Sequence, residues 1–277
     1  MQPLDDGVER ASALLRQADG LLVAAGAGMG VDSGLPDFRG TEGFWRAYPP
    51  LARLKRAFHD MASPSTFDSD PRLAWGFYGH RLALYRATTP HAGFGILRAI
   101  AARMRHGAFV FTSNVDGQFQ RAGATEDAVV ECHGSIQHLQ CTRPCCAAIW
   151  PADAVAPEVD MQACRLLSPL PACPRCGALA RPNILMFNDG AWLPERSEAQ
   201  YERFSRWRAG VGRLAVIELG AGVDIPSVRR MAETQGVPIV RVNPREAAVR
   251  PGVALKMGAL PALGLLAEAL GIDKDQN

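Results

Sequence analysis

Glycine-rich and polar stretches follow several apolar runs in this 277-residue chain, where the ends of predicted strands would bring them together. The longest is AAGAGMGVDSGLPDFRG, residues 24–40, directly after the apolar run 21–23. Glycine turns at strand ends expose backbone N–H groups that can bind phosphate, because no Cβ obstructs the approach. A tight turn for close packing is the alternative that the glycines alone leave open. The loop Asp37-Phe38-Arg39 favours ligand binding, since it offers a charge, an aromatic face and a bidentate donor.

The spacing of these glycines differs from that of the common dinucleotide fingerprint. Gly26, Gly28 and Gly30 form G-x-G-x-G, whereas the fingerprint is G-x-G-x-x-G followed by an acidic residue at a later strand end. No acid stands at a matching strand end in this sequence. The glycine motif by itself is therefore weak evidence for a nucleotide site.

A second polar stretch, TSNVDGQFQRAG at 112–123, leaves the apolar run 109–111. Asn114 and Asp116 are two positions apart, so on extended backbone both side chains face one way. Together they could hold one carboxamide, the amide by donating and the carboxylate by accepting. A turn in which both side chains cap their own backbone is the alternative.

His133 is the candidate general base. It follows the apolar run 128–130, and imidazole is the side chain whose ordinary pKa suits proton transfer near neutral pH. A histidine satisfied within the core is the alternative for any one of the six histidines.

Tyr78 and Arg81 are a candidate pair for binding an anion. At positions i and i+3 of the helix predicted over 70–86 they share one face. A guanidinium binds a carboxylate bidentately and stays charged, which suits an acidic ligand. A surface arginine beside a packing tyrosine is the alternative, and spacing alone favours it.

Four of the seven cysteines have the spacing of a metal site. Cys141 and Cys145 form one close pair, and Cys173 and Cys176 form another. Four thiolates in such pairs make a closed tetrahedral Zn²⁺ site, which has no coordination position for water and is therefore structural. Because the first pair is C-x3-C, Cys146 competes with Cys145 as ligand, and Cys145 is the preferred choice.

Alternating strands and helices predict an α/β fold with a mostly parallel, doubly wound sheet. Strands or extended segments are expected at 21–25, 109–112, 128–130, 184–187, 214–219 and 237–242. Helices are expected at 8–17, 70–86, 93–104, 227–235 and 260–270. The cysteine- and proline-rich region 134–183 interrupts this alternation and is interpreted as an inserted small module.

Composition and charge argue against several classes of protein. A formal charge of +2 and the absence of basic blocks give no case for binding nucleic acid or a membrane surface. The N-terminal residues lack the apolar core of a secretory signal, and nothing approaches a membrane span. We therefore expect a cytoplasmic protein whose cysteines are reduced. The oligomeric state is left open, with a monomer expected.

These motifs, in this order, resemble those of the sirtuins, the NAD-dependent protein deacylases. GAGMGVDSGLPDFRG is very similar to the sirtuin signature, TSNVDGQFQRAG resembles T-Q-N-I-D-x-L-H-x-x-A-G, and Cys132-His133-Gly134 matches the E-L-H-G box. The resemblance covers about residues 20–260. It implies a Rossmann-like NAD-binding domain from 1–133 and 184–277, with a zinc-binding module inserted at 134–183. A helical part of the small domain would come from about 41–90.

The resemblance also implies a role for each matching residue. His133 would be the catalytic base, and Asn114 and Asp116 would hold nicotinamide. NAD would be bound by Gly26, Ala27, Gly28, Asp37, Phe38, Arg39, Ser113, Asn114, Asp116, Gly220, Ala221, Gly222 and Asn243. Ile184, Met186 and Phe187 would pair with the backbone of the substrate by β-augmentation. DPRLAWGFYGHR resembles the segment of those sirtuins that remove malonyl, succinyl or glutaryl groups, in which a pair like Tyr78 and Arg81 binds the distal carboxylate.

The reaction implied by the resemblance transfers an acyl group from a protein lysine to ADP-ribose. The acyl oxygen attacks C1′ of the nicotinamide ribose, and nicotinamide leaves. His133 then deprotonates a ribose hydroxyl, which attacks the alkylimidate. The products are free lysine, nicotinamide and O-acyl-ADP-ribose.

The chain departs from the sirtuin pattern at several positions. Ser113 replaces a glutamine, Gly30 replaces a serine, Gln118-Phe119 replaces Leu-His, and Asn188-Asp189-Gly190 replaces Gly-Glu. Two other functions are therefore kept open. One is ADP-ribosyl transfer to protein or NAD hydrolysis, and the other is NAD sensing without catalysis.

Overall fold

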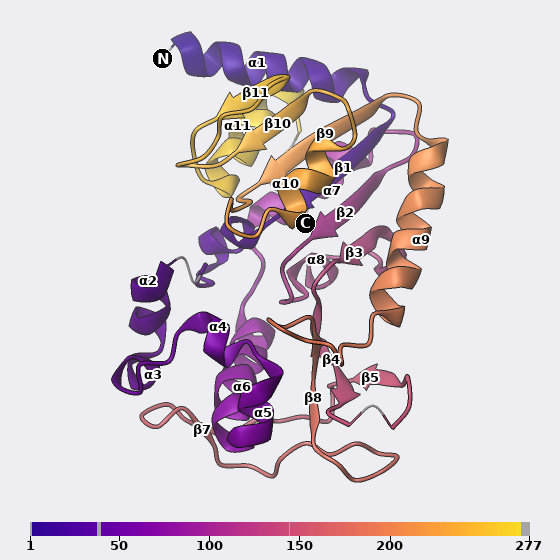
Figure 1. The fold of residues 1–277 in the computed structure, drawn as a ribbon. Coiled ribbons are helices and arrows are strands. Elements are labelled where there is room, and N and C mark those ends of the chain that lie inside the picture. Colours follow the sequence, from indigo (N-terminus) through magenta and orange to yellow (C-terminus); the bar gives the residue numbers. More distant parts are fainter. Residues whose placement is uncertain (1, 38–39, 144, 273–277) are drawn as a thin grey trace.

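The computed structural model describes residues 2–37, 40–143 and 145–272. Its larger part is built on a six-stranded sheet of order β11-β10-β9-β1-β2-β3, in which every pair is parallel (Figure 1). The strands are β1 (Gly20–Ala25), β2 (Ala108–Thr112), β3 (Val129–Glu131), β9 (Leu214–Leu219), β10 (Ile239–Val242) and β11 (Gly252–Leu255). Strand order reverses between β1 and β9, and doubly wound sheets bind ligands at the carboxyl ends of the strands beside such a reversal.

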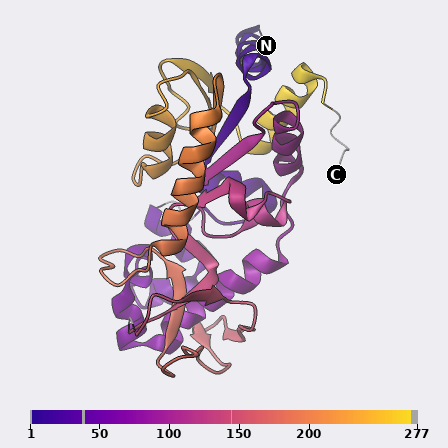
Figure 2. The same cartoon turned by 90° about the vertical axis from the view of Figure 1, so that its right-hand side faces the viewer.

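Helices cover both faces of this sheet because its strands are apolar on both sides (Figure 2). Leu21 and Val23 of β1 pack in one core cluster with α1 (Gln2–Gln17), α7 (Ala92–Ala101) and α11 (Ala259–Leu270). Leu22, between them, faces the opposite cluster with α9 (Glu195–Gly210) and α10 (Ser227–Glu233). The period of two along β1 thus divides the core into two layers. The predicted doubly wound parallel sheet is confirmed.

The smaller part combines short strands with a helical segment from earlier in the chain. Its antiparallel sheet has the order β5-β4-β8, and β6 pairs with β7. The elements are α2 (Gly40–Ala47), α3 (Pro49–Arg53), α4 (Phe58–Met61), α5 (Pro64–Ser69), α6 (Pro71–Ala87), β4 (Gly134–Cys141), β5 (Ile149–Pro151), β6 (Val159–Asp160), β7 (Arg165–Leu166) and β8 (Ala180–Ile184). One core cluster joins Trp75 and Phe77 of α6 to Ile136 and Leu139 of β4. We propose that these elements form the small domain, and its boundaries stay a prediction.

Connecting segments complete the described chain: η1 (Ala27–Met29), η2 (Val31–Ser33), α8 (Gln118–Arg121) and η3 (Glu126–Ala128). One strand expectation needs correction. The extended segment predicted at 184–187 is placed too late, because strand β8 ends at Ile184. The residues after Ile184 are held by single backbone hydrogen bonds, from Leu185 N to His133 O and from Phe187 N to Ala62 O.

Within the described residues, no helix has both the length and the apolar character needed to cross a membrane.

Candidate active site

A cavity of about 640 Å³ lies at the carboxyl ends of β1, β2 and β9. It reaches from these strand ends to α6 and to the chain beyond β8. The predicted site residues that line it are Gly26, Ala27, Asp37, Tyr78, Arg81, Ser113, Asn114, Asp116, His133, Ile184, Met186, Phe187, Gly220 and Gly222. Phe38 and Arg39 lie outside the described residues. The cavity therefore brings together residues that the sequence places in six separate segments.

The two glycine turns, after β1 and after β9, pack directly on each other. A Cβ added to Gly26 would lie 2.7 Å from Ala221 Cα, and one added to Gly28 would lie 2.7 Å from Gly220 Cα. The turns are also joined by a hydrogen bond from Gly28 N to Gly220 O of 3.1 Å. Close packing thus explains these glycines, as the alternative interpretation expected. The two turns also form part of the cavity wall, through Gly26, Ala27, Gly220 and Gly222. Gly28 and Ala221, which were predicted to bind the cofactor, do not line the cavity.

Asn243, predicted to contact the cofactor, is fully buried behind the same wall. Its Nδ2 donates to Ala221 O at 3.0 Å, and its Oδ1 accepts from the backbone N–H groups of Arg245 and Glu246. The residue therefore ties the turn after β9 to the turn after β10. Both Arg245 and Glu246 line the cavity.

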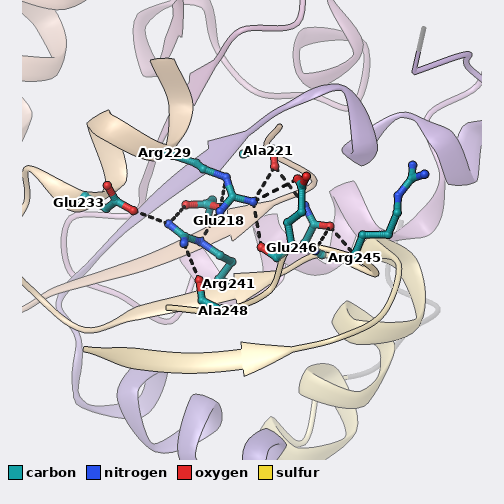
Figure 3. Close-up of polar contacts among 9 residues, drawn as sticks. Glu218, Ala221, Arg229, Glu233, Arg241, Arg245, Glu246 and Ala248 are labelled. Atoms are coloured by element: carbon teal, nitrogen blue, oxygen red, sulfur yellow. Dashed lines mark hydrogen bonds and ion pairs between the residues drawn. The ribbon is translucent and has the colours of Figure 1, made fainter. Parts of the chain in front are cut away.

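A cluster of charged side chains packs against the turns that follow β9 and β10 (Figure 3). Glu218 of β9 is fully buried, and it accepts from Arg241 Nη2 of the neighbouring strand β10 at 2.8 Å. Arg229 of α10 donates to Ala221 O at 3.1 Å and to Glu246 O at 2.8 Å. Removing one partner from a buried ion pair strongly destabilises a fold. The cluster therefore holds Arg229 in place, and Arg229 in turn holds the two turns of the cavity wall together. The cluster was not predicted, although acidic and basic residues inside apolar strands, such as Glu218 and Arg241, mark it in the sequence.

Asn114 and Asp116 line the cavity and also shape the loop that carries them. Asn114 Nδ2 donates to Gly26 O at 3.0 Å, and Asp116 Oδ1 accepts from Gln118 N at 2.9 Å. Asp116 is buried, and burial raises the pKa of its carboxyl to about 6. The capping alternative is therefore correct for Asp116, and both residues also line the cavity.

His133 stands between β3 and β4, half-buried on the wall of the cavity. Burial lowers the pKa of its imidazole below the usual 6.5, and a hydrogen bond with the backbone of Ser113 opposes that shift. The ring is therefore mainly neutral at pH 7, as a general base must be. Its Nε2 lies 3.2 Å from the hydroxyl oxygen of Ser227, a residue that sequence analysis did not single out.

Arg81 is buried, 7% exposed, rather than on the surface. Its Nε donates to the hydroxyl of Tyr85 at 2.9 Å. The guanidinium carbon lies 5.2 to 5.7 Å from the ring centres of Phe77, Tyr78 and Tyr85, within cation–π range. Tyr85, one helical turn after Arg81, also lines the cavity and was missed in the sequence.

The segment beyond β8 is anchored by an ion pair that explains one departure from the sirtuin pattern. Arg181 binds Asp189 bidentately, at 2.7 and 2.8 Å, and both side chains are almost fully buried. Asp189 also accepts from Met186 N at 3.2 Å. The aspartate therefore holds the chain that bears Ile184, Met186 and Phe187 against the cavity.

The four predicted metal ligands converge in the small part of the molecule. The sulfur atoms of Cys141, Cys145, Cys173 and Cys176 all lie within 4.8 Å of one another. Sulfur atoms of Cys141 and Cys176, and of Cys145 and Cys173, are 3.7 Å apart. Tetrahedral Zn–S bonds of about 2.3 Å place sulfurs about 3.8 Å apart, so the cluster fits zinc. Cys146 lies 3.7 Å from Cys145, beside the converging set.

Comparison with known proteins agrees with this geometry. Residues 26–208 match the model of the Sir2 family. The chain is 32% identical over 268 residues to an NAD-dependent protein deacylase of Thermus thermophilus, covering 94% of this chain and 93% of that protein. It is 32% identical over 241 residues to NAD-dependent protein deacylase 1 of Pseudomonas aeruginosa, covering 86% and 88%. A solved Sir2 homologue in complex with ADP-ribose matches with a TM-score of 0.68 and 26% identity, over 95% of this chain and 97% of that chain. On these matches and on its motifs, the chain belongs to the Sir2 family.

Proposed function

We propose that this protein is an NAD-dependent protein-lysine deacylase that transfers the acyl group to ADP-ribose and releases nicotinamide. One observation carries the proposal: His133, Asn114, Asp116 and the first glycine turn line a single cavity at the reversal of the sheet. The curated relatives named above support it, because they are NAD-dependent protein deacylases. Acylated lysines of proteins are the proposed substrates.

The residues present fit NAD as cosubstrate. Ala27, with Gly26 and Gly220 beside it on the cavity wall, would hold its phosphates. The N–H groups of Gly26 and Gly220 themselves donate to Leu219 O and Val242 O, so these two glycines would contribute close approach of the backbone. Asn114 and Asp116 would hold the carboxamide. NAD supplies a leaving group, nicotinamide, and a ribose hydroxyl as acyl acceptor, and His133 would take the proton from that hydroxyl.

Zinc would be held by Cys141, Cys145, Cys173 and Cys176 as a structural ion, since four protein ligands leave no position for water. The departure at Gln118-Phe119 does not favour the other two functions, because both side chains have places in the packed fold. Phe119 packs edge-on against Phe94 in the core, with ring centres 4.9 Å apart. Gln118 is buried and donates to Tyr85 O.

We further propose that the acyl group can be acidic. A buried guanidinium at the cavity wall, held by Tyr85 and faced by Tyr78, suits the carboxylate of a malonyl, succinyl or glutaryl chain. Deacetylation would persist, because acetyl-lysine needs no contact with Arg81.

The cytoplasm is the proposed location, since a site of four thiols requires a reducing compartment. We also propose a monomer, and the modest formal charge of +2 argues against a nucleic-acid partner.

Replacing Arg81 by Met should lower kcat/KM for a succinyl-lysine peptide far more than for an acetyl-lysine peptide. Loss of a charged hydrogen bond costs about 1.5–3 kcal/mol, which corresponds to a roughly 10- to 150-fold loss with the succinyl substrate. Rates of both peptides under saturating NAD measure the effect. Arg72→Met is the matched control, because Arg72 lies at the other end of α6 and donates to Leu166 O. Equal losses on both peptides would contradict an acidic acyl pocket.

A further inference from the structure

The contact between His133 and Ser227 joins two elements that are far apart in the chain. Ser227 is the first residue of α10, and its hydroxyl oxygen lies 3.2 Å from His133 Nε2. Pro226 takes the N-cap position of this helix, with no side-chain cap. The hydroxyl of Ser227 therefore faces the imidazole instead of capping its own helix.

The start of α10 is held firmly enough to orient this hydroxyl. Arg229, two residues later, reaches from the same helix to Ala221 O and Glu246 O, as Figure 3 shows. Val228, between them, is buried in the core and lines the cavity. The charged cluster around Glu218 thus supports Ser227 as well as the cavity wall.

Hydrogen-bond chemistry sets the direction of this contact. A neutral imidazole has one N–H donor and one acceptor nitrogen. The backbone of Ser113 stabilises the charged ring, so it acts as an acceptor of a ring N–H. If that N–H is on Nδ1, then Nε2 is the acceptor, and the Ser227 hydroxyl donates to it.

We propose that Ser227 is a positioning residue for His133, whose hydroxyl donates to Nε2 and keeps that nitrogen the proton acceptor until a substrate hydroxyl replaces Ser227. When the ribose hydroxyl gives its proton to Nε2, the new N–H can donate to the oxygen of Ser227, because a hydroxyl both donates and accepts. No proton leaves Ser227 in either state. This inference rests on the proposed deacylation, in which His133 is the base.

The role predicts an effect on only one part of the reaction. Departure of nicotinamide needs no base, whereas capture of the acyl group by the ribose hydroxyl needs His133. A residue that acts through His133 should therefore slow formation of O-acyl-ADP-ribose and spare the exchange of labelled nicotinamide into NAD. A residue that merely supports the fold would slow both.

The test compares Ser227→Ala and Ser227→Thr with the parent in both assays, using an acetyl-lysine peptide as substrate. Ser227→Ala should form product about three- to tenfold more slowly, the effect of one lost hydrogen bond, with the exchange rate and the KM for NAD unchanged. Ser227→Thr, which keeps the hydroxyl, should restore product formation. Ser205→Ala is the control, since Ser205 lies on the exposed side of α9 and bonds Tyr201 O.

Two results would overturn the inference: an unchanged product rate in Ser227→Ala, or equal losses in product formation and exchange. Failure of the proposed function is distinguishable from both, because the parent itself would then form no O-acyl product.

Discussion

Replacing His133 by Ala should lower the formation of O-acyl-ADP-ribose by about 10²- to 10⁴-fold, the range typical of a lost general base. The imidazole lines the cavity in its neutral form, because burial holds its pKa below the usual range. No other histidine is among the residues that line the cavity in the described chain. Binding of NAD should be nearly unchanged, since phosphates and carboxamide are assigned to other residues.

Product formation by mass spectrometry and NAD binding by calorimetry would measure both effects. His138→Ala is the matched control, because His138 lies on β4 close in sequence but outside the residues that line the cavity. Turnover retained in His133→Ala would remove the histidine from the mechanism.

Replacing Cys145 by Ser should cost the protein its zinc and unfold the small part of the molecule. Binding of structural zinc contributes about 10–16 kcal/mol in small zinc-binding peptides, which matches or exceeds the whole stability of a typical domain. The strands β4 and β8 lead directly to two of the ligands, since Cys141 ends β4 and pairs with Ala180 at the start of β8. Without the metal this sheet loses its closure, and the chain between residues 141 and 180 becomes accessible to protease.

Metal content by mass spectrometry, thermal unfolding and limited proteolysis would test this prediction. Cys146→Ser is the matched control, because its thiol lies next to Cys145 yet outside the four that converge. It should keep one zinc ion per chain and full stability. A zinc-free protein that stays folded and active, or loss of metal in Cys146→Ser alone, would contradict the assignment.

The central strands could be predicted from the sequence because each is a short apolar run that ends in a turn of special chemistry. Strand β9 occupies the predicted positions 214–219, stopped by the glycine turn that begins at Gly220. The α6 helix could be predicted from its apolar pattern and from Asp70-Pro71 at its start. In the structure the side chain of Asp70 accepts from Leu73 N, which caps the helix.

Helix α9 could not be predicted because its inward face is largely polar. Ser197 donates to Glu131 O, and Gln200 accepts from Glu131 N, so both side chains bind the backbone of the edge strand β3. Phe204 is the one buried apolar side chain among the buried residues of this helix. The apolar period on which prediction depends is therefore absent. Strand β11 was missed for a different reason: it begins at Gly252 directly after Pro251, and Val253 is its one β-branched residue, so its composition does not indicate a strand.

The candidate site divides in the same way. Residues carried by local motifs, such as Asn114 and His133, were visible in the sequence and are brought to one cavity by the sheet. Tyr85 lies at i+4 from Arg81 on the same helix, a spacing that could have marked it in the sequence. Ser227 contacts His133 over a long sequence separation, and no local pattern marks it. The buried ion pair Arg181–Asp189 likewise depends on how the chain after strand β8 folds back toward that strand.

One reaction tests the central claim most directly. Purified protein, NAD and equal amounts of acetyl-lysine and succinyl-lysine peptide would be incubated together, and the products identified by mass spectrometry. Formation of O-acyl-ADP-ribose, with the succinyl product ahead of the acetyl product, is the predicted result. Release of nicotinamide without any O-acyl product would contradict deacylation and would favour NAD hydrolysis or ADP-ribosyl transfer.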